Sequence, residues 1–292
     1  MHRSSCRERR SDHGPPSVER FGRERGSGPS RFSGGVITLR SPDDGTEWAV
    51  VAGATGSIGT NIVERMIRRG LGVVAVARSA SGLESLTTTH DLVRPCVADI
   101  TSDDSIDLIR DSLSGVCRAV INAAAAPLGG HVSEVTPEAV LAAVDVKVNG
   151  TLRLVRAVDT ALVVDSRVIV LGGNLAYDPI PEAATAGVGN AALANLVKQL
   201  SRSLGKRGVT THMVAPGPVW SERLRALLAD AASARGVSED VVLAEFEDRS
   251  PIGHLVTIDE VGWAVETLLA PEARSLAGGT LLLDSGQRTA FP

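Results

Sequence analysis

Cysteine is scarce in this chain, and the way it is distributed argues against two kinds of site. Only Cys6, Cys96 and Cys117 occur in 292 residues, and no two of them form a C-x-x-C pair. Cys96 and Cys117 fall inside apolar runs, which favours reduced core thiols over a disulfide or a metal site. The six histidines are scattered without ligand spacing, so no structural metal is expected.

Long apolar runs and a surplus of basic residues are also missing. The longest apolar runs have the length of strands, so we expect no membrane span. The formal net charge of -4 lacks the basic excess that nucleic-acid binding usually requires. With 43% apolar and 22% charged residues, the composition predicts one large globular core in a cytoplasmic protein.

Apolar periodicity is absent from residues 1–45, which are rich in Arg, Ser, Gly and Pro. Such a composition is typical of disorder. The segment has no apolar stretch for a secretory signal, and its interleaved acids argue against a transit peptide. We interpret it as a dispensable extension or a start assigned too far upstream, with a functional basic arm as the alternative, and place the folded domain at residues 46–292.

From residue 47 onward, short β-branched runs alternate with amphipathic stretches, among them a long helix expected near residues 137–158. Apolar strands separated by helices predict a parallel sheet covered on both faces. The expected fold is a single-domain, doubly wound α/β sheet of the Rossmann type. Ligands of such folds bind at the carboxyl ends of the strands, where the strand order reverses.

A glycine-rich turn, "AGATGSIG", follows the first expected strand and opens the first helix. Glycines at 53, 56 and 59 allow a tight turn and a close approach to a pyrophosphate, whose charge the helix amides would meet. A purely structural turn is the alternative. The residues that we expect to contact a dinucleotide here are Gly53, Thr55, Gly56, Ser57, Ile58 and Gly59.

The second and third strands end on charged residues that bear on cofactor choice. Arg78 offers a fork of donors to a 2'-phosphate, where an acid would instead accept from a 2'-hydroxyl. The sequence therefore favours NADP(H) over NAD(H), unless Arg78 is only a solvated surface residue. Asp99 is placed to accept from an adenine amino group, or alternatively to cap the following helix.

At this point the chain resembles the short-chain dehydrogenase/reductase family, over about residues 48–288. "AGATGSIG" is similar to the family's Thr-Gly-x-x-x-Gly-x-Gly turn, "VADIT" matches its adenine-side Asp, and "INAAA" keeps Asn122 of its Asn-Asn-Ala-Gly motif. "VAPGPVWSERL" matches the loop over the nicotinamide and implies contacts from Pro216, Gly217 and Val219. The resemblance also implies a homo-oligomer, either a dimer or a tetramer.

The resemblance implies hydride transfer between a nicotinamide and a carbonyl or alcohol, with four residues responsible for the chemistry. The family's serine, tyrosine, lysine and asparagine positions fall here on Gly173, Ala186, Asn190 and Lys147. All four are replaced. Since one lost acid or base typically costs a factor of about 10² to 10⁴, ordinary ketone reduction should be very poor.

Few residues could act instead. Lys147 and Asn190 exchange the family's Asn and Lys, so a lysine could enter the same polar volume from the other helix while Asn190 contacts the ribose. Tyr177, the only tyrosine, could present a phenol to substrate or be a wall residue. His131 and Asn174 are further candidates, although a solvated loop and a turn are the simpler interpretations.

Residues 220–254 lie where the family has a substrate lid, with apolar residues at helical spacing in two short helices. Such faces are typical of a pocket for a hydrophobic small molecule, or of core. Two functions remain open. One is an NADP(H)-binding protein without ketoreductase chemistry, either a repurposed enzyme or a pseudoenzyme; the other is a genuine oxidoreductase with its proton donor relocated to Lys147 or Tyr177.

Overall fold

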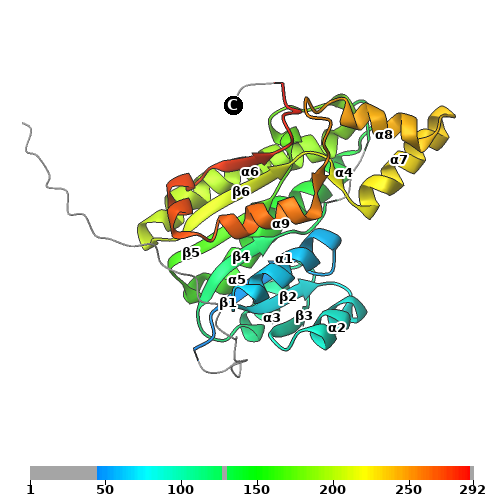
Figure 1. Ribbon diagram of the computed structural model, residues 1–292. Helices are drawn as coiled ribbons and strands as arrows, with labels where there is room; N and C mark the ends of the chain where they lie inside the picture. The colour runs from blue at the N-terminus through cyan, green and yellow to red at the C-terminus, as the bar shows by residue number, and fades with distance from the viewer. Residues whose placement is uncertain (1–44, 127–129, 290–292) are drawn as a thin grey trace, which may run out of the picture. The chain divides into compact units, whose positions relative to one another are not determined.

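The structure is a computed structural model, and it describes residues 45–126 and 130–289. The segment predicted to be disordered lies almost entirely outside the described residues. The described chain forms a seven-stranded parallel sheet in the order β3-β2-β1-β4-β5-β6-β9, as Figure 1 shows. The strands are β1 Trp48–Ala52, β2 Gly72–Ala77, β3 Val93–Val97, β4 Cys117–Asn122, β5 Leu162–Leu171, β6 Thr210–Pro216 and β9 Thr280–Leu283.

The central strands are apolar throughout because both faces of the sheet are covered. Along β1, Val50 packs into the cluster on one face and Val51 into the cluster on the other, and both are fully buried. A strand that is buried on both faces shows no alternation of apolar and polar residues. The predicted doubly wound fold is thus confirmed.

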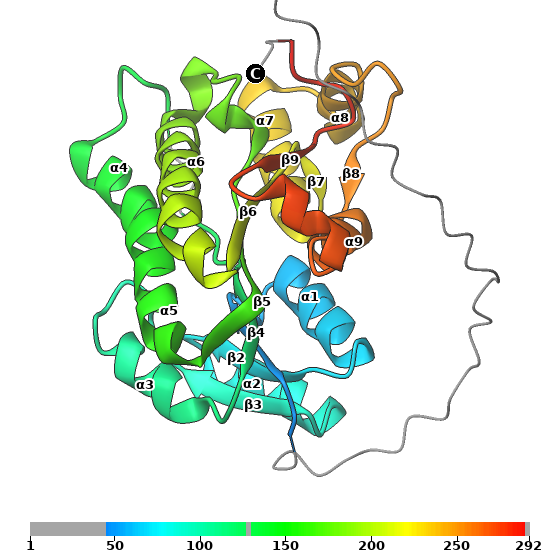
Figure 2. The ribbon, with the colours of Figure 1, turned by 90° about the vertical axis from the view of Figure 1, so that its left-hand side faces the viewer.

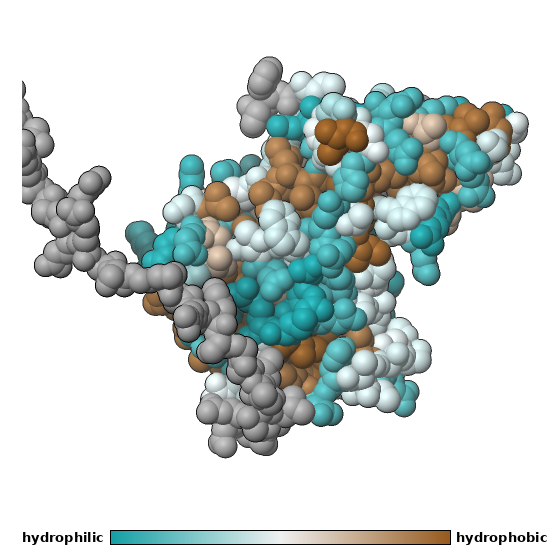
Figure 3. Space-filling view, in the orientation of Figure 1, coloured by the Kyte–Doolittle hydropathy of each residue, from teal (hydrophilic) through white to brown (hydrophobic). Residues whose placement is uncertain are grey.

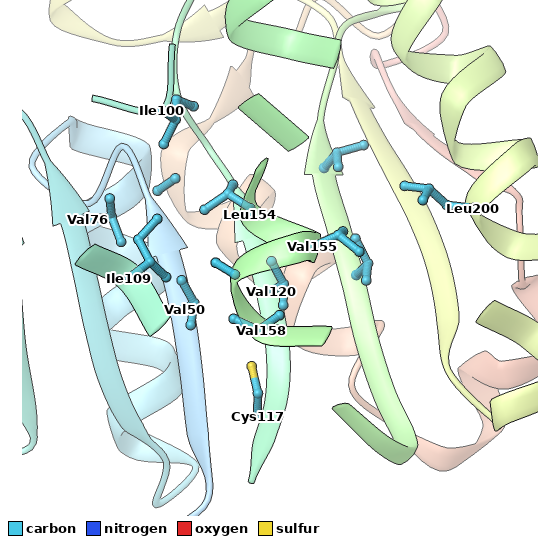
Figure 4. Close-up of a cluster of buried hydrophobic side chains, with 14 of the residues drawn as sticks. Val50, Val76, Ile100, Ile109, Cys117, Val120, Leu154, Val155, Val158 and Leu200 are labelled. Carbon is cyan, nitrogen blue, oxygen red and sulfur yellow. The ribbon is translucent and has the colours of Figure 1, made fainter. Parts of the chain in front are cut away.

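Helices form a layer on each side of the sheet, which Figure 2 shows edge-on. One layer contains α3 Ser105–Ser112, α4 Pro137–Val144, α5 Gly150–Val158 and α6 Ala184–Leu204. The other contains α1 Ser57–Arg68, α2 Ala80–Thr89 and α9 Ile258–Thr267. In Figure 4, Ile109, Leu154 and Val158 from the first layer meet Val50 and Val120 of the sheet.

The helix expected near residues 137–158 is interrupted in its middle. Between α4 and α5 the backbone forms a π-helical segment, η1 Asp145–Asn149, with Lys147 at its centre. The wider turn is stabilised from outside: the Thr151 hydroxyl donates to the Lys147 carbonyl at 2.6 Å and the Asn122 amide donates to the Val146 carbonyl at 3.3 Å. Periodicity alone could not reveal this interruption, because π segments of one turn occur within otherwise helical sequence.

Two further helices, α7 Glu222–Arg235 and α8 Glu239–Glu247, follow β6. A short parallel pair, β7 Val219–Trp220 and β8 Val256–Thr257, brackets them. Figure 1 shows α7 and α8 projecting away from the sheet, and Figure 3 shows apolar side chains on their surface. Exposed apolar residues on or beside these helices are Leu227, Val237 and Val241. Among the described helices, none has the length and apolar character needed to cross a membrane.

Candidate functional site

The loop after β1 packs so closely that two of its glycines cannot be replaced without movement. Gly53 has φ +76°, and a Cβ there would lie 2.8 Å from the backbone of Ala123 and Ala124. A Cβ on Gly59 would lie 2.0 Å from the Gly53 carbonyl oxygen. The exits of β1 and β4 therefore meet at the first turn of α1, where the strand order reverses, and this is where ligands of such folds bind.

The N-terminus of α1 is left open for an anion. Gly56 occupies the N-cap position, and the helix has neither a side-chain cap nor an acid in its first turn. By contrast, Thr136 caps α4 and Thr257 closes a capping box on α9. First-turn amides have no partner within a helix, so this end fits a pyrophosphate. Thr55, Ser57 and Ile58 are exposed or partly exposed beside it.

The charged residues that end β2 and β3 lie at the same edge. Arg78 is exposed directly after β2, and its charge acts on Asp99. One oxygen of Asp99 accepts from the Thr101 amide at 2.9 Å and the Thr101 hydroxyl at 2.8 Å. These bonds, the amide above all, and then the charges of Arg78 and Arg153, lower the pKa of Asp99. Arg78 is thus a cation that could meet an adenosine 2'-phosphate at this edge, and the ionised Asp99 could accept from an adenine amino group.

Asp99 does not cap the following helix, which was the alternative interpretation. Helix α3 begins at Ser105, with Asp104 at the N-cap position. Asp99 instead closes the turn that leaves β3, because its bonds go to Thr101.

Asn122 was expected among the cofactor contacts, but its side chain is engaged within the protein. The residue is only 2% exposed. Its amide donates to the Thr151 hydroxyl at 2.9 Å and to the Val146 carbonyl, while its oxygen accepts from the Ala124 amide at 3.1 Å. These hydrogen bonds fix η1 against the end of β4, and a cofactor contact from Asn122 stays a prediction.

A cavity of about 660 Å³ opens beside this edge of the sheet. Apolar side chains make up much of its wall, including Leu175, Ile180, Leu224, Leu227 and Phe246. The four positions that the resemblance assigns to catalysis all line it: Lys147, Gly173, Ala186 and Asn190. Also in the wall are Ile58 of the α1 turn, and Pro216, Gly217 and Val219 of the loop expected over the nicotinamide.

Lys147 reaches into the cavity wall from η1. Its Nζ donates to the carbonyl of Leu171, the last residue of β5, at 2.8 Å and to the carbonyl of Ala124 at 3.0 Å. Burial, and then the positive charge of Arg223, lower the pKa of Lys147 to about 8. The lysine thus lies between the ends of β4 and β5.

Asn190, on α6, is 7% exposed and shares this cavity. A Cβ on Gly173 would lie 2.9 Å from the Asn190 Nδ2. The amide therefore fills the space that a serine side chain at position 173 would need. Gly173 and Asn190 are complementary in shape, which sequence spacing alone did not indicate.

The other candidates are placed differently. The Tyr177 hydroxyl hydrogen-bonds to that of Thr280 on β9, and Tyr177 is not part of the cavity wall. The expectation that its phenol faces a substrate is not supported, because β9 takes the hydroxyl. His131 is exposed and bonds to Ser133 at 2.7 Å, as a loop histidine does. Asn174 does line the cavity.

Two arginines that the sequence interpretation passed over also line the cavity. Arg223 lies in the first turn of α7 and Arg249 follows α8. Both fall within the segment identified as a lid, where the apolar spacing drew attention away from its charges. The sequence could have indicated these arginines, because each is a basic residue near apolar positions that were expected to face a pocket.

Comparison with known proteins places these features among reductases. Residues 53–288 match the family model described as Enoyl-(Acyl carrier protein) reductase. The chain is 25% identical over 244 residues to the 3-oxoacyl-(acyl-carrier-protein) reductase of Escherichia coli, covering 82% of this chain and 96% of that protein. It is 25% identical over 213 residues to the NADH-using enoyl-(acyl-carrier-protein) reductase of Bacillus subtilis, covering 69% and 77%.

Solved structures agree. The actinorhodin polyketide ketoreductase with NADPH superposes with a TM-score of 0.76 at 25% identity, covering 86% of this chain and 100% of that one. For L-sorbose reductase of Gluconobacter frateurii with NADPH and L-sorbose, the TM-score is 0.77 at 19% identity, covering 84% and 98%. The second likeness concerns the fold alone.

Proposed function

The chain belongs to the short-chain dehydrogenase/reductase family, and on that premise we propose that it is an NADP(H)-dependent carbonyl reductase with Lys147 as its proton donor. Of the two functions that the sequence leaves open, this is the oxidoreductase with a relocated donor. The observation that carries it is the position of the Lys147 ammonium, in the wall of the cavity and between the ends of β4 and β5.

The hydrogen bonds of Lys147 are consistent with one of its protons being available to a substrate in the cavity. An ammonium has three donors, and two of them are taken by the carbonyls of Ala124 and Leu171. A third donor is left for a carbonyl oxygen in the cavity. After giving up that proton, the neutral amine keeps two N–H groups, one for each carbonyl, so its position need not change.

The acidity of Lys147 suits this role. A pKa of about 8 lies close to neutral pH. A general acid with such a pKa is mostly protonated at neutral pH and still acidic enough to transfer its proton. When bound, NADPH supplies the hydride. The charged Lys147 would polarise the carbonyl of the substrate and then neutralise the alkoxide oxygen, which are the tasks of the serine and tyrosine in the family pattern.

The cofactor preference rests on Arg78, since the open α1 terminus would bind the pyrophosphate that both cofactors share. The actinorhodin polyketide ketoreductase described above contains NADPH, which supports NADP(H), whereas the Bacillus subtilis relative uses NADH. We include Asn190 as a donor to the ribose hydroxyls, and Pro216, Gly217 and Val219 as the loop over the nicotinamide. A cytoplasmic location and a homo-oligomer, and mobility of the lid at about residues 220–254, belong to the same proposal.

A specific observation also keeps the second function in view. Gly173 and Ala186 line the cavity without any hydroxyl, so the wall lacks the family's polarising and proton-donating groups at these positions. A protein that binds NADP(H) and a hydrophobic ligand without net redox, or a pseudoenzyme, would have the same wall. In that case Lys147 would only bind a ligand oxygen.

Cofactor titration followed by a turnover screen separates the two functions. Purified protein is titrated with NADPH and NADH, and nicotinamide absorbance is then followed with panels of ketones, aldehydes and enones. The reductase predicts tighter NADPH binding and loss of absorbance with at least one carbonyl class, and Lys147→Met should slow that loss by a factor of about 10² to 10⁴ while sparing NADPH binding. Tight NADPH binding with no turnover on any panel would instead favour the non-redox function.

A further inference from the structure

The cavity carries more positive charge than carbonyl reduction requires. Three of its wall residues are cationic: Lys147, Arg223 and Arg249. Lys147 reaches in from η1, beside the ends of the strands, whereas both arginines come from the lid segment. Most of the other wall residues are apolar, and the remaining polar ones include Asn174, Asn190 and Gln287.

Arg223 is held in place but not neutralised. One of its terminal nitrogens donates to the Ala126 carbonyl at 2.9 Å, and burial lowers the pKa of the guanidinium. Within residues 45–126 and 130–289, no carboxylate forms an ion pair with it. Elsewhere on the lid, Arg235 is paired with Glu245 at 2.5 Å. Arg223 is exposed at the cavity wall, so its guanidinium is accessible to an anionic ligand and can form charge-assisted hydrogen bonds with it.

Arg249 adds a second cation at the same wall. Its guanidinium lies over the ring of Phe246, with 4.7 Å to the centroid. Phe246 itself lines the cavity. Stacking on an aromatic face holds an arginine in a fixed direction and leaves its in-plane N–H groups open.

Two acids also line the cavity, so its three cations leave a formal excess of one positive charge. Asp178 and Glu182 line it from the stretch after β5. One oxygen of Asp178 accepts from the amide and the hydroxyl of Thr289, at 3.0 Å and 3.2 Å. Glu182 is exposed. Neither acid forms an ion pair with Arg223 or Arg249 in the described chain.

We infer that the substrate of this cavity is an apolar oxo acid, whose carboxylate binds Arg223 with support from Arg249 and whose carbonyl oxygen meets Lys147. The inference rests on the function proposed above and names its substrate class. A guanidinium matches a carboxylate through two parallel hydrogen bonds. The apolar wall accommodates the remainder of the molecule.

The spacing of the cations limits the length of the acid. Lys147 and Arg223 bind the carbonyls of Ala124 and Ala126, two residues apart. Two residues of extended chain span at most about 7 Å. Each cation lies one hydrogen bond beyond its carbonyl, so the Lys147 Nζ and the bonded Arg223 nitrogen are at most roughly 13 Å apart, a spacing that admits a short oxo acid such as a 4-oxo acid.

Binding of a matched acid and ester tests this without turnover. The full chain is titrated calorimetrically with 3-benzoylpropionate, a 4-oxo acid, and with its methyl ester. The acid should bind at least about tenfold more tightly, since a hydrogen bond to a charged group contributes about 1.5–3 kcal/mol. Arg223→Met should lower the affinity for the acid to that for the ester. Arg249→Met should lower the affinity for the acid by a smaller factor.

Arg225→Met is the matched control. Arg225 lies on the same helix over the ring of Trp220, with 5.0 Å to the centroid, and is not part of the cavity wall. Arg225→Met should leave the affinities for the acid and for the ester unchanged. Equal binding of acid and ester, no binding of either, or an equal loss in Arg223→Met and Arg225→Met would overturn the inference. If Arg223→Met fails to fold, the ratio of acid to ester affinity in the parent decides.

These outcomes are separable from those of the proposed function. Selective binding of the acid with no NADPH consumption on any carbonyl would retain the anion site and reject the reductase. NADPH consumption that proceeds equally well with acid and ester would retain the reductase and reject the oxo-acid substrate.

Discussion

At the scale of single residues, the position of Lys147 depends on neighbours that never touch the cavity. Asn122 and Thr151 bond to each other and to the carbonyls of Val146 and Lys147, which the wide turn of η1 leaves accessible. Because the buried Asn122 amide forms its hydrogen bonds within the protein, removing it should change stability, which can be measured separately from activity.

Asn122→Ala should lower the free energy of unfolding by about 1–3 kcal/mol, because a buried carbonyl loses its donor. Urea denaturation followed by circular dichroism measures the change. Asn149→Ala is the control, since Asn149 is exposed and its side chain donates to the Asp145 carboxylate at 2.8 Å. Equal effects of the two substitutions would contradict the role given to Asn122.

Arg78→Ala should weaken NADPH binding by about tenfold or more and leave NADH binding unchanged, because a bond to a charged group contributes about 1.5–3 kcal/mol. Fluorescence titration of both cofactors checks this. Arg156→Ala, at an exposed position on α5, should change neither affinity. Equal binding of the two cofactors to the parent protein would remove the reason for assigning Arg78 to a 2'-phosphate.

At the scale of elements, the turn from β1 into α1 distinguishes glycines that are required from one that is not. Gly59→Ala should unfold or strongly destabilise the protein, because its Cβ would lie 2.0 Å from the Gly53 carbonyl oxygen. Gly56→Ala should fold normally, since the nearest atom to its Cβ would be 3.5 Å away. Thermal unfolding compares them, and similar melting temperatures would show that the turn is looser than described.

The pairing of Gly173 with Asn190 makes the order of substitutions matter. Gly173→Ser alone should be destabilising, because its Cβ would meet the Asn190 amide at 2.9 Å, and Asn190→Ala should relieve that effect. A double-mutant cycle measured by urea denaturation gives the coupling, which for contacting residues is about 0.5–3 kcal/mol. Strictly additive effects would show that the two side chains do not compete for space.

Because Gly173 and Asn190 are in contact, restoring the family's catalytic residues requires that both positions be changed together. The combined variant Gly173→Ser, Ala186→Tyr, Asn190→Lys and Lys147→Asn should reduce activated ketones faster than the parent. The four positions line one cavity, so the groups would converge there. If the combined variant folds but remains slower than the parent, the surrounding scaffold no longer supports the family's chemistry.

For the molecule as a whole, the fold was more predictable than the site. Runs such as that of β1, buried on both faces, and the glycine turn after it are set by local sequence, so the parallel sheet and the cofactor edge were both expected. The π segment around Lys147 depends on Asn122 and Thr151, which are 29 residues apart, and sequence spacing does not contain that contact.

The positions of Tyr177 and Arg223 show the same limit from two sides. Tyr177 lies in a loop where a phenol could turn either way, and the hydroxyl of Thr280, 103 residues later, decides its direction. Arg223 belongs to the cavity because its helix packs over the exit of β4, where it meets the Ala126 carbonyl. Contacts between distant segments settle which side chains share a cavity.

The most direct measurement is the pH dependence of kcat/KM for NADPH-dependent carbonyl reduction by the full chain. Lys147 donates a proton only while it is charged, and its pKa lies near 8. The rate should therefore be level below about pH 8 and fall about tenfold per unit above it. Lys147→Met should lower the rate by about 10² to 10⁴ and abolish that decline. A parent that reduces carbonyls with the same profile as Lys147→Met would contradict the assignment of Lys147 as proton donor.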